Sequence, residues 1–111
     1  MFELEVSLPQ QTDLTRVPAT VEAVCAAEGL RRALKATLAK YPGSVHWHYR
    51  RDRERGTLEI TLWPEQSRLW FKVSRGRAGV WIEELLPRLS EALAAALTAT
   101  MVSGGDQGAE R

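Results

Sequence analysis

Residues 44–74 read SVHWHYRRDRERGTLEITLWPEQSRLWFKVS, and this stretch decides the fold. It contains three runs in which apolar and polar residues alternate. The apolar residues are Val45, Trp47 and Tyr49 in the first run, Leu58, Ile60 and Leu62 in the second, and Leu69, Phe71 and Val73 in the third. Alternation with a period of two is typical of strands with one buried face. The stretch therefore predicts three consecutive antiparallel strands.

The connection between the second and third runs sets their register. Its four residues, PEQS, form a loop whose proline suits a type I turn. Closing this loop with Trp63 opposite Arg68 keeps both apolar sets on one face of the sheet. The same register places Glu59 beside Lys72 on the other face, and such an opposite-charge pair is mildly favourable. Loop length and hydrophobic pattern therefore agree on this register.

The connection between the first and second runs, RDRERG, is longer and leaves their register open. Pairing Tyr49 with Leu58 keeps the apolar residues of both runs on one face. That pairing places His48 beside Glu59 on the polar face, with His46 at the next position on the same face. We take it as the expected register.

The rest of the chain predicts one more strand and helices. Residues 1–8 alternate apolar with acidic or polar side chains and predict a fourth strand, whose neighbour the sequence does not identify. Residues 19–41 have a helical composition, but their apolar pattern changes phase at Gly29, so we expect two short helices or one kinked helix. Residues 80–102 repeat apolar side chains at helical spacing and predict a long amphipathic helix over the apolar sheet face.

The predicted fold class is α+β, with a three- to four-stranded antiparallel sheet, helices packed on one face and the order β-α-β-β-β-α. We expect a single domain over residues 1–102. Residues 103–111 contain three glycines and no large apolar side chain, which predicts a disordered C-terminal tail. A chain of 111 residues is long enough to bury a core without disulfides or a structural metal.

Composition excludes several classes of protein. No run approaches the roughly 18 apolar residues of a membrane-spanning helix, so we expect no membrane partner. The first residues carry Glu3 and Glu5 and lack the basic start of a signal peptide. The single cysteine, Cys25, excludes an internal disulfide and fits a reducing compartment. These features predict a cytoplasmic protein.

The charges are distributed unevenly along the chain. Residues 1–30 hold five acidic residues and one basic residue, residues 31–77 hold four acidic and twelve basic residues, and residues 78–111 hold five acidic and two basic residues. The net charge is nevertheless only +1. A basic middle with acidic flanks permits an anionic partner, or it can reflect attraction between parts of the same chain.

The polar face of the sheet is the predicted functional surface. Its candidate partner-binding residues are Trp63, Trp70, His46, His48, Arg50, Arg68 and Lys72. Exposed tryptophan and arginine side chains are typical of the centres of protein interfaces. The leading hypothesis is therefore a non-catalytic protein-interaction module that uses this face to bind a protein partner or to form a homodimer, with no cofactor. Its alternative is that arginine stems or the loop 51–56 cover Trp70.

Nucleic-acid binding through the same face is the second hypothesis. Aromatic side chains on a sheet can stack on bases while neighbouring arginines and lysines contact phosphates. Trp70, Arg68 and Lys72 provide these residue types on the predicted polar face. This hypothesis depends on local charge and not on a sequence motif.

A metal-dependent enzyme is the third hypothesis. His46 and His48 lie on one face of a strand, and Glu59 is the expected cross-strand neighbour of His48. Two histidines and a carboxylate form a facial set of ligands used by some zinc and iron enzymes. The His-x-His pattern is short, and Lys72 competes for the carboxylate. The default interpretation is that both histidines are exposed at the surface.

Overall fold

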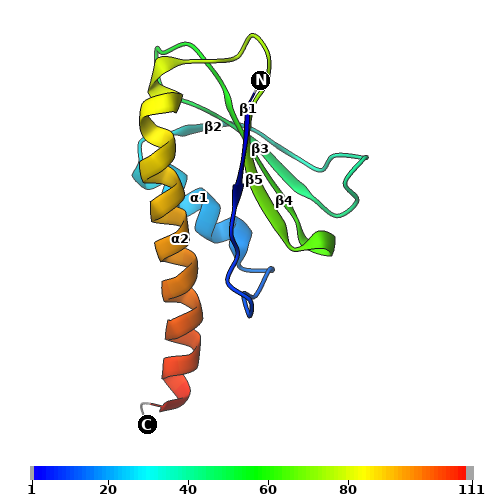
Figure 1. The fold of residues 1–111 in the computed structure, drawn as a ribbon, viewed down its shortest axis with the longest axis vertical. Coiled ribbons are helices and arrows are strands. Elements are labelled where there is room, and N and C mark those ends of the chain that lie inside the picture. The colour runs from blue at the N-terminus through cyan, green and yellow to red at the C-terminus, as the bar shows by residue number, and fades with distance from the viewer. Residues whose placement is uncertain (1, 110–111) are drawn as a thin grey trace.

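The computed structural model describes the backbone of residues 2–109 and the side chains of residues 2–99. One antiparallel sheet of five strands, in the order β1-β5-β4-β3-β2, carries two helices on a single face (Figure 1). The strands are β1 (Phe2–Val6), β2 (Arg31–Ala36), β3 (Val45–Arg50), β4 (Leu58–Trp63) and β5 (Arg68–Val73), and the helices are α1 (Val17–Ala27) and α2 (Val80–Ala109). The α+β class is as predicted, but the sheet has five strands and not three to four.

Both predicted registers are confirmed. On β4 and β5, Trp63 pairs with Arg68 and Glu59 pairs with Lys72, and a short 3-10 turn, Pro64–Gln66, makes the connection. On β3 and β4, Tyr49 pairs with Leu58, so His48 lies opposite Glu59. The alternation of the sequence therefore places its polar residues on the face that the helices leave free.

The prediction of helical structure beyond Gly29 is wrong. Helix α1 ends where predicted, because Gly29 adopts a left-handed φ of 79° and the amide of Leu30 donates to the carbonyl of Cys25. The next residues form β2, which pairs with the edge of β3 despite their helix-favouring composition. Backbone pairing with β3 and the contacts of Lys35 and Arg32 with Glu22 on α1 override local propensity here.

The core lies between the sheet and the helices. The α2 residues predicted to cover the apolar sheet face are buried: Ile82, Leu85, Leu86, Leu89, Leu93 and Leu97. Strand β1 is the fourth predicted strand and pairs with β5 at the sheet edge. Two helices do not cover five strands completely, so Phe2 and Leu4 remain 42% and 37% exposed. They line a groove of about 770 Å³ with Leu86 and Pro87 of α2.

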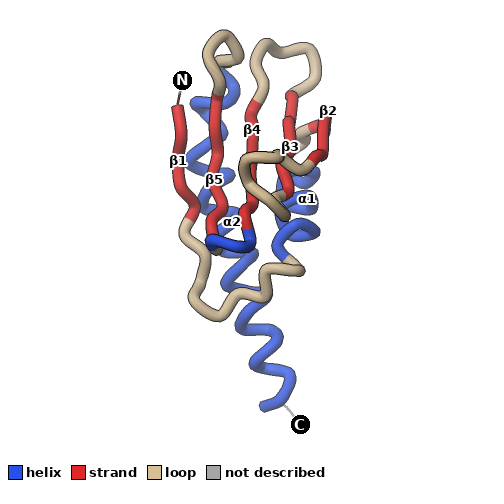
Figure 2. Tube along the Cα trace, turned by 90° about the vertical axis from the view of Figure 1, so that its right-hand side faces the viewer, coloured by secondary structure: helices blue, strands red, loops and turns tan. Residues whose placement is uncertain are grey.

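The open face of the sheet is partly covered, which corrects the expectation of an exposed Trp70. Residues 37–44, which connect β2 to β3, lie over this face (Figure 2). The Tyr41 ring contacts the Trp63 and Trp70 rings at centroid distances of 4.9 Å and 5.2 Å. The Arg68 guanidinium lies 4.3 Å from the Trp70 centroid, so Trp70 is only 3% exposed.

The structure also bears on the expected absence of a membrane-spanning helix and on the predicted C-terminal tail. Among the described residues, no helix has the length and apolar character needed to cross a membrane. The backbone of α2 continues to Ala109. The side chains of residues 100–111 lie outside the described part of the chain, and the disorder of residues 103–111 stays a prediction.

Candidate metal centre

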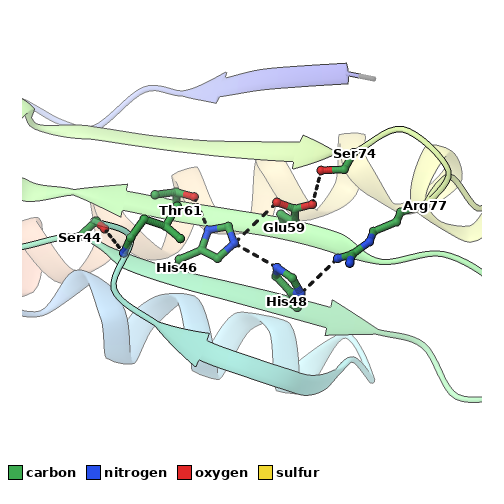
Figure 3. A network of polar contacts seen from close by, with 8 residues as sticks. Ser44, His46, His48, Glu59, Thr61, Ser74 and Arg77 are labelled. Atoms are coloured by element: carbon green, nitrogen blue, oxygen red, sulfur yellow. Dashed lines mark hydrogen bonds and ion pairs between the residues drawn. The ribbon is translucent and has the colours of Figure 1, made fainter. Parts of the chain in front are cut away.

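Three side chains with metal-binding atoms meet at the middle of the open face. His46 and His48 extend from β3, and Glu59 extends from the adjacent position of β4 (Figure 3). His46 Nε2 lies 3.0 Å from His48 Nε2 and 3.6 Å from Glu59 Oε1. One ligand atom from each of the three residues lies within 4.8 Å of the other two. The structure therefore brings together the three residues of the metal hypothesis.

The neighbours of the two imidazoles favour one tautomer of each ring. Arg77 Nη1 lies 3.4 Å from His48 Nδ1, and because a guanidinium only donates, this nitrogen accepts. The proton of His48 is then on Nε2 and is donated to His46 Nε2. His46 carries its proton on Nδ1 and donates it to Thr61 Oγ1 at 2.8 Å. A directed chain of hydrogen bonds thus runs from Arg77 to Thr61.

The Glu59 carboxylate is buried without a compensating lysine or arginine. The residue is 7% exposed, and its Oε2 accepts a hydrogen bond of 2.5 Å from Ser74 Oγ. Lys72 is its partner in the β4–β5 register, yet within residues 2–99 no lysine or arginine forms an ion pair with Glu59. Burying a carboxylate is costly unless a cation pairs with it. The cluster therefore provides a place for a positive charge.

The surroundings of both histidines favour the neutral imidazole. Burial lowers the pKa of His46 below its usual value, and the neighbouring His48 and Lys72 lower it further, while Glu59 acts in the opposite direction. Burial also lowers the pKa of His48, with Arg77 adding to the effect and Glu59 opposing it. Neutral imidazoles are the form that binds metal ions. The default interpretation of two exposed histidines is wrong for His46, which is 6% exposed.

Cross-strand pairing arranges the predicted partner-binding residues in successive rows on the open face. Trp63 and Arg68 form the row at the end of the sheet where β4 meets β5, and Arg68 forms an ion pair with Glu5 at 2.9 Å. The next row holds Trp70 and His46, with Thr61 between them, and the row after it holds His48, Glu59 and Lys72. Arg50 ends β3 beyond that row. The structure therefore places Trp70 and the metal centre on one face with Thr61 between them.

Thr61, Ser74 and Arg77 contact the metal centre but were not among the site residues predicted from the sequence. Ser74 directly follows β5 and continues its alternation on the polar face, so the pattern contained a signal for it. Arg77 lies in the turn before α2, and its position beside His48 depends on the path of that turn. Cys25, by contrast, is buried on α1, and burial raises the pKa of its thiol to about 12, which excludes a thiolate nucleophile.

Comparisons with known proteins give no family for this chain. No protein-family model matches it, and no match is found among curated proteins or among solved structures.

Proposed function

We propose that this protein binds one divalent transition-metal ion through His46 Nε2, His48 Nε2 and Glu59. The observation that carries the proposal is the convergence of two imidazoles on a buried carboxylate that, within residues 2–99, has no lysine or arginine partner. Ligands about 2.0–2.2 Å from a tetrahedral zinc ion stand about 3.4 Å apart. Two separations in the cluster, 3.0 Å and 3.6 Å, are close to that value.

The hydrogen bonds to His46 and Glu59 support the same assignment. In metal sites the second ring nitrogen of a ligating histidine is usually held by another polar group, and ligating carboxylates are hydrogen-bonded in turn. Thr61 Oγ1 holds Nδ1 of His46, and Ser74 Oγ holds the second oxygen of Glu59. These two contacts orient the ligand atoms of His46 and Glu59 toward the cluster.

The ligand set favours a catalytic site over a purely structural one. Structural zinc sites are closed by four protein ligands, whereas catalytic sites combine three protein ligands with a water molecule. A zinc ion lowers the pKa of its bound water to about 7 and so supplies hydroxide near neutral pH. We infer that metal-assisted hydrolysis is the reaction class of this site.

Calorimetric titration of zinc into chelator-treated protein tests the proposal. We expect one zinc ion per chain, and we expect His46→Ala and Glu59→Gln each to weaken binding by about tenfold or more. Glu65→Gln is the matched control, because Glu65 is an exposed carboxylate in the Pro64–Gln66 turn. Wild-type affinity in both site variants, with circular dichroism showing intact folding, would refute the assignment.

Protein interaction, homodimer formation and a cytoplasmic location stay predictions from the sequence. The interaction hypothesis depended on two exposed tryptophans, and Trp70 is covered by Tyr41 and Arg68. The nucleic-acid hypothesis depended on the same ring as a stacking surface. The metal centre therefore replaces both as the leading hypothesis. Light scattering coupled to gel filtration measures the oligomeric state directly.

A further inference from the structure

A basic hollow lies beside the metal centre and shares His48 with it. The hollow has a volume of about 370 Å³ and is lined by Arg50, Arg55, Arg77 and His48, together with Thr57 and small residues. We propose that it binds the phosphate group of a small phosphate monoester. Phosphate binding itself does not depend on the proposed metal, whereas its coupling to the metal, derived below, rests on the proposed function.

The hollow is built by two loops that are fixed to each other. The amide of Thr57, after the β3–β4 connection, donates to the carbonyl of Arg77 at 2.9 Å. The indole of Trp81, on α2, donates to the carbonyl of Arg55 at 2.9 Å. At Gly79 any side chain would collide with that same Arg55 carbonyl, so the close approach of the loops requires glycine. The backbone positions of Arg55 and Arg77 are therefore set before any ligand arrives.

The arginines of the hollow have no acidic partner. Across residues 2–99, no carboxylate lies within ion-pair distance of Arg50, Arg55 or Arg77. Arg68 and Arg88, by contrast, each bind a glutamate. Guanidinium groups match the geometry of phosphate oxygens and can each donate two hydrogen bonds to them. A concave surface lined by one sign of charge also concentrates its field on the ligand.

The size of the hollow favours a small molecule over a nucleic acid. Its volume of about 370 Å³ falls in the lower part of the range for small-molecule sites, roughly 300–1,000 Å³. Sheet-bound single strands also require exposed aromatic rings on which bases stack. The ring proposed for that role, Trp70, is buried. A single phosphate group is therefore the ligand that this surface fits.

His48 couples the hollow to the metal centre. Arg77 approaches His48 Nδ1 and so favours the tautomer with the proton on Nε2, the atom that the metal requires. A phosphate between Arg77 and His48 accepts from the guanidinium and from a protonated Nδ1, which frees Nε2 for the metal. By linkage, phosphate and metal each raise the affinity for the other by the same factor.

Calorimetric titration with phenylphosphonate, a phosphate monoester analogue that cannot be hydrolysed, tests the proposal. In chelator-treated protein we expect binding that Arg55→Ala and Arg77→Ala each weaken by about fivefold or more. Arg75→Ala is the matched control, because it removes the same charge from the same turn outside the hollow, and we expect it to stay within about twofold of wild type. Circular dichroism verifies that each variant is folded.

The same titration, repeated with zinc present, tests the coupling between the metal and the phosphate. With zinc present we expect phenylphosphonate to bind about fivefold more tightly. Glu59→Gln removes a proposed zinc ligand that does not line the hollow, so we expect it to abolish this gain while leaving binding without zinc. Absence of binding, or equal losses in Arg55→Ala and Arg75→Ala, overturns the phosphate site even if zinc binds. Binding of a single-stranded oligonucleotide that competes with phenylphosphonate and depends equally on Arg75 overturns it in favour of a nucleic-acid surface. Equal phenylphosphonate affinity with and without zinc overturns the coupling but not the phosphate site.

Discussion

His46 Nε2 accepts a hydrogen bond from His48 Nε2 at 3.0 Å, between two side chains on the same face of one strand. The geometry follows from the period of a strand, in which alternate residues project to one side. A proton holds the two nitrogens together in the metal-free protein. A metal ion has to displace this proton, and the neighbours of His48 therefore decide how readily the metal binds.

Arg77→Glu should strengthen zinc binding. The arginine favours the His48 tautomer that opposes metal binding, whereas a glutamate would accept a hydrogen bond from His48 Nδ1 and favour the competent tautomer. We expect about tenfold tighter binding, the lower end of the effect of such outer partners. Arg75→Glu makes the same charge change in the same turn and serves as the control in calorimetry. Equal gains in both variants would show a general charge effect and not a tautomer effect.

The stability of the metal-free protein should fall as the pH drops below about 6.5. The pKa values of His46 and His48 are lower in the folded protein than in the unfolded chain, so the unfolded chain binds protons first. The resulting stabilisation is fully present above the unfolded pKa and is lost as the pH falls through the folded values. Urea unfolding at a series of pH values measures it, and His46→Gln should flatten the slope below about pH 6.5. An unchanged slope would contradict this origin.

Glu22→Ala should lower the free energy of unfolding by about 1–3 kcal/mol, the usual cost of leaving a buried donor unpaired. Glu22 accepts a hydrogen bond of 2.9 Å from the indole of the buried Trp47 and binds Lys35 at 2.7 Å. Glu22→Gln keeps an acceptor for the indole and loses mainly the partly exposed ion pairs, which contribute little. Chemical denaturation should therefore rank the variants wild type, Gln, Ala. Equal losses in the two variants would show that the charge, and not the indole contact, matters.

The sequence predicted the strands that carry the metal centre but not what covers them. Strict alternation and a four-residue turn predicted the β4–β5 register, and alternation alone favoured the β3–β4 register that places His48 opposite Glu59. Strand β2 was missed because RRALKA is a helix-favouring sequence, and only pairing with β3 and contacts with α1 make it a strand. Such contacts join residues far apart in the sequence, so local patterns do not contain them.

The same limit explains the error at Trp70. Its alternation correctly assigned it to the polar face, and the Arg68 guanidinium over its ring agrees with the alternative of cover by an arginine side chain. The contact with Tyr41 was not foreseen, because Tyr41 lies in a connection that was expected to be helical. Arg77 was missed for a related reason, since glycine-containing turns such as residues 74–79 have many accessible paths. The alternation of apolar and polar residues thus assigns side chains to a face of the sheet, but it does not show which of them a loop then covers.

Tyr41→Ala should uncover Trp70 and destabilise the protein. The tyrosine ring contacts both Trp63 and Trp70, and each aromatic pair contributes about 0.5–1.5 kcal/mol. We expect the free energy of unfolding to fall by about 1–2 kcal/mol and tryptophan emission to shift to longer wavelength. Lys40→Ala, which removes only the exposed cation over the Tyr41 ring, should change stability by less than about 0.5 kcal/mol. An unshifted emission spectrum in Tyr41→Ala would show that another segment covers Trp70.

The most direct test of the metal centre is a crystal structure of zinc-loaded protein, with anomalous diffraction recorded on both sides of the zinc absorption edge. We predict one anomalous peak on the open face, bonded to Nε2 of His46, Nε2 of His48 and a Glu59 oxygen at about 2.0–2.2 Å. A peak at other residues, or the two imidazoles still hydrogen-bonded to each other at saturating zinc, would contradict the account.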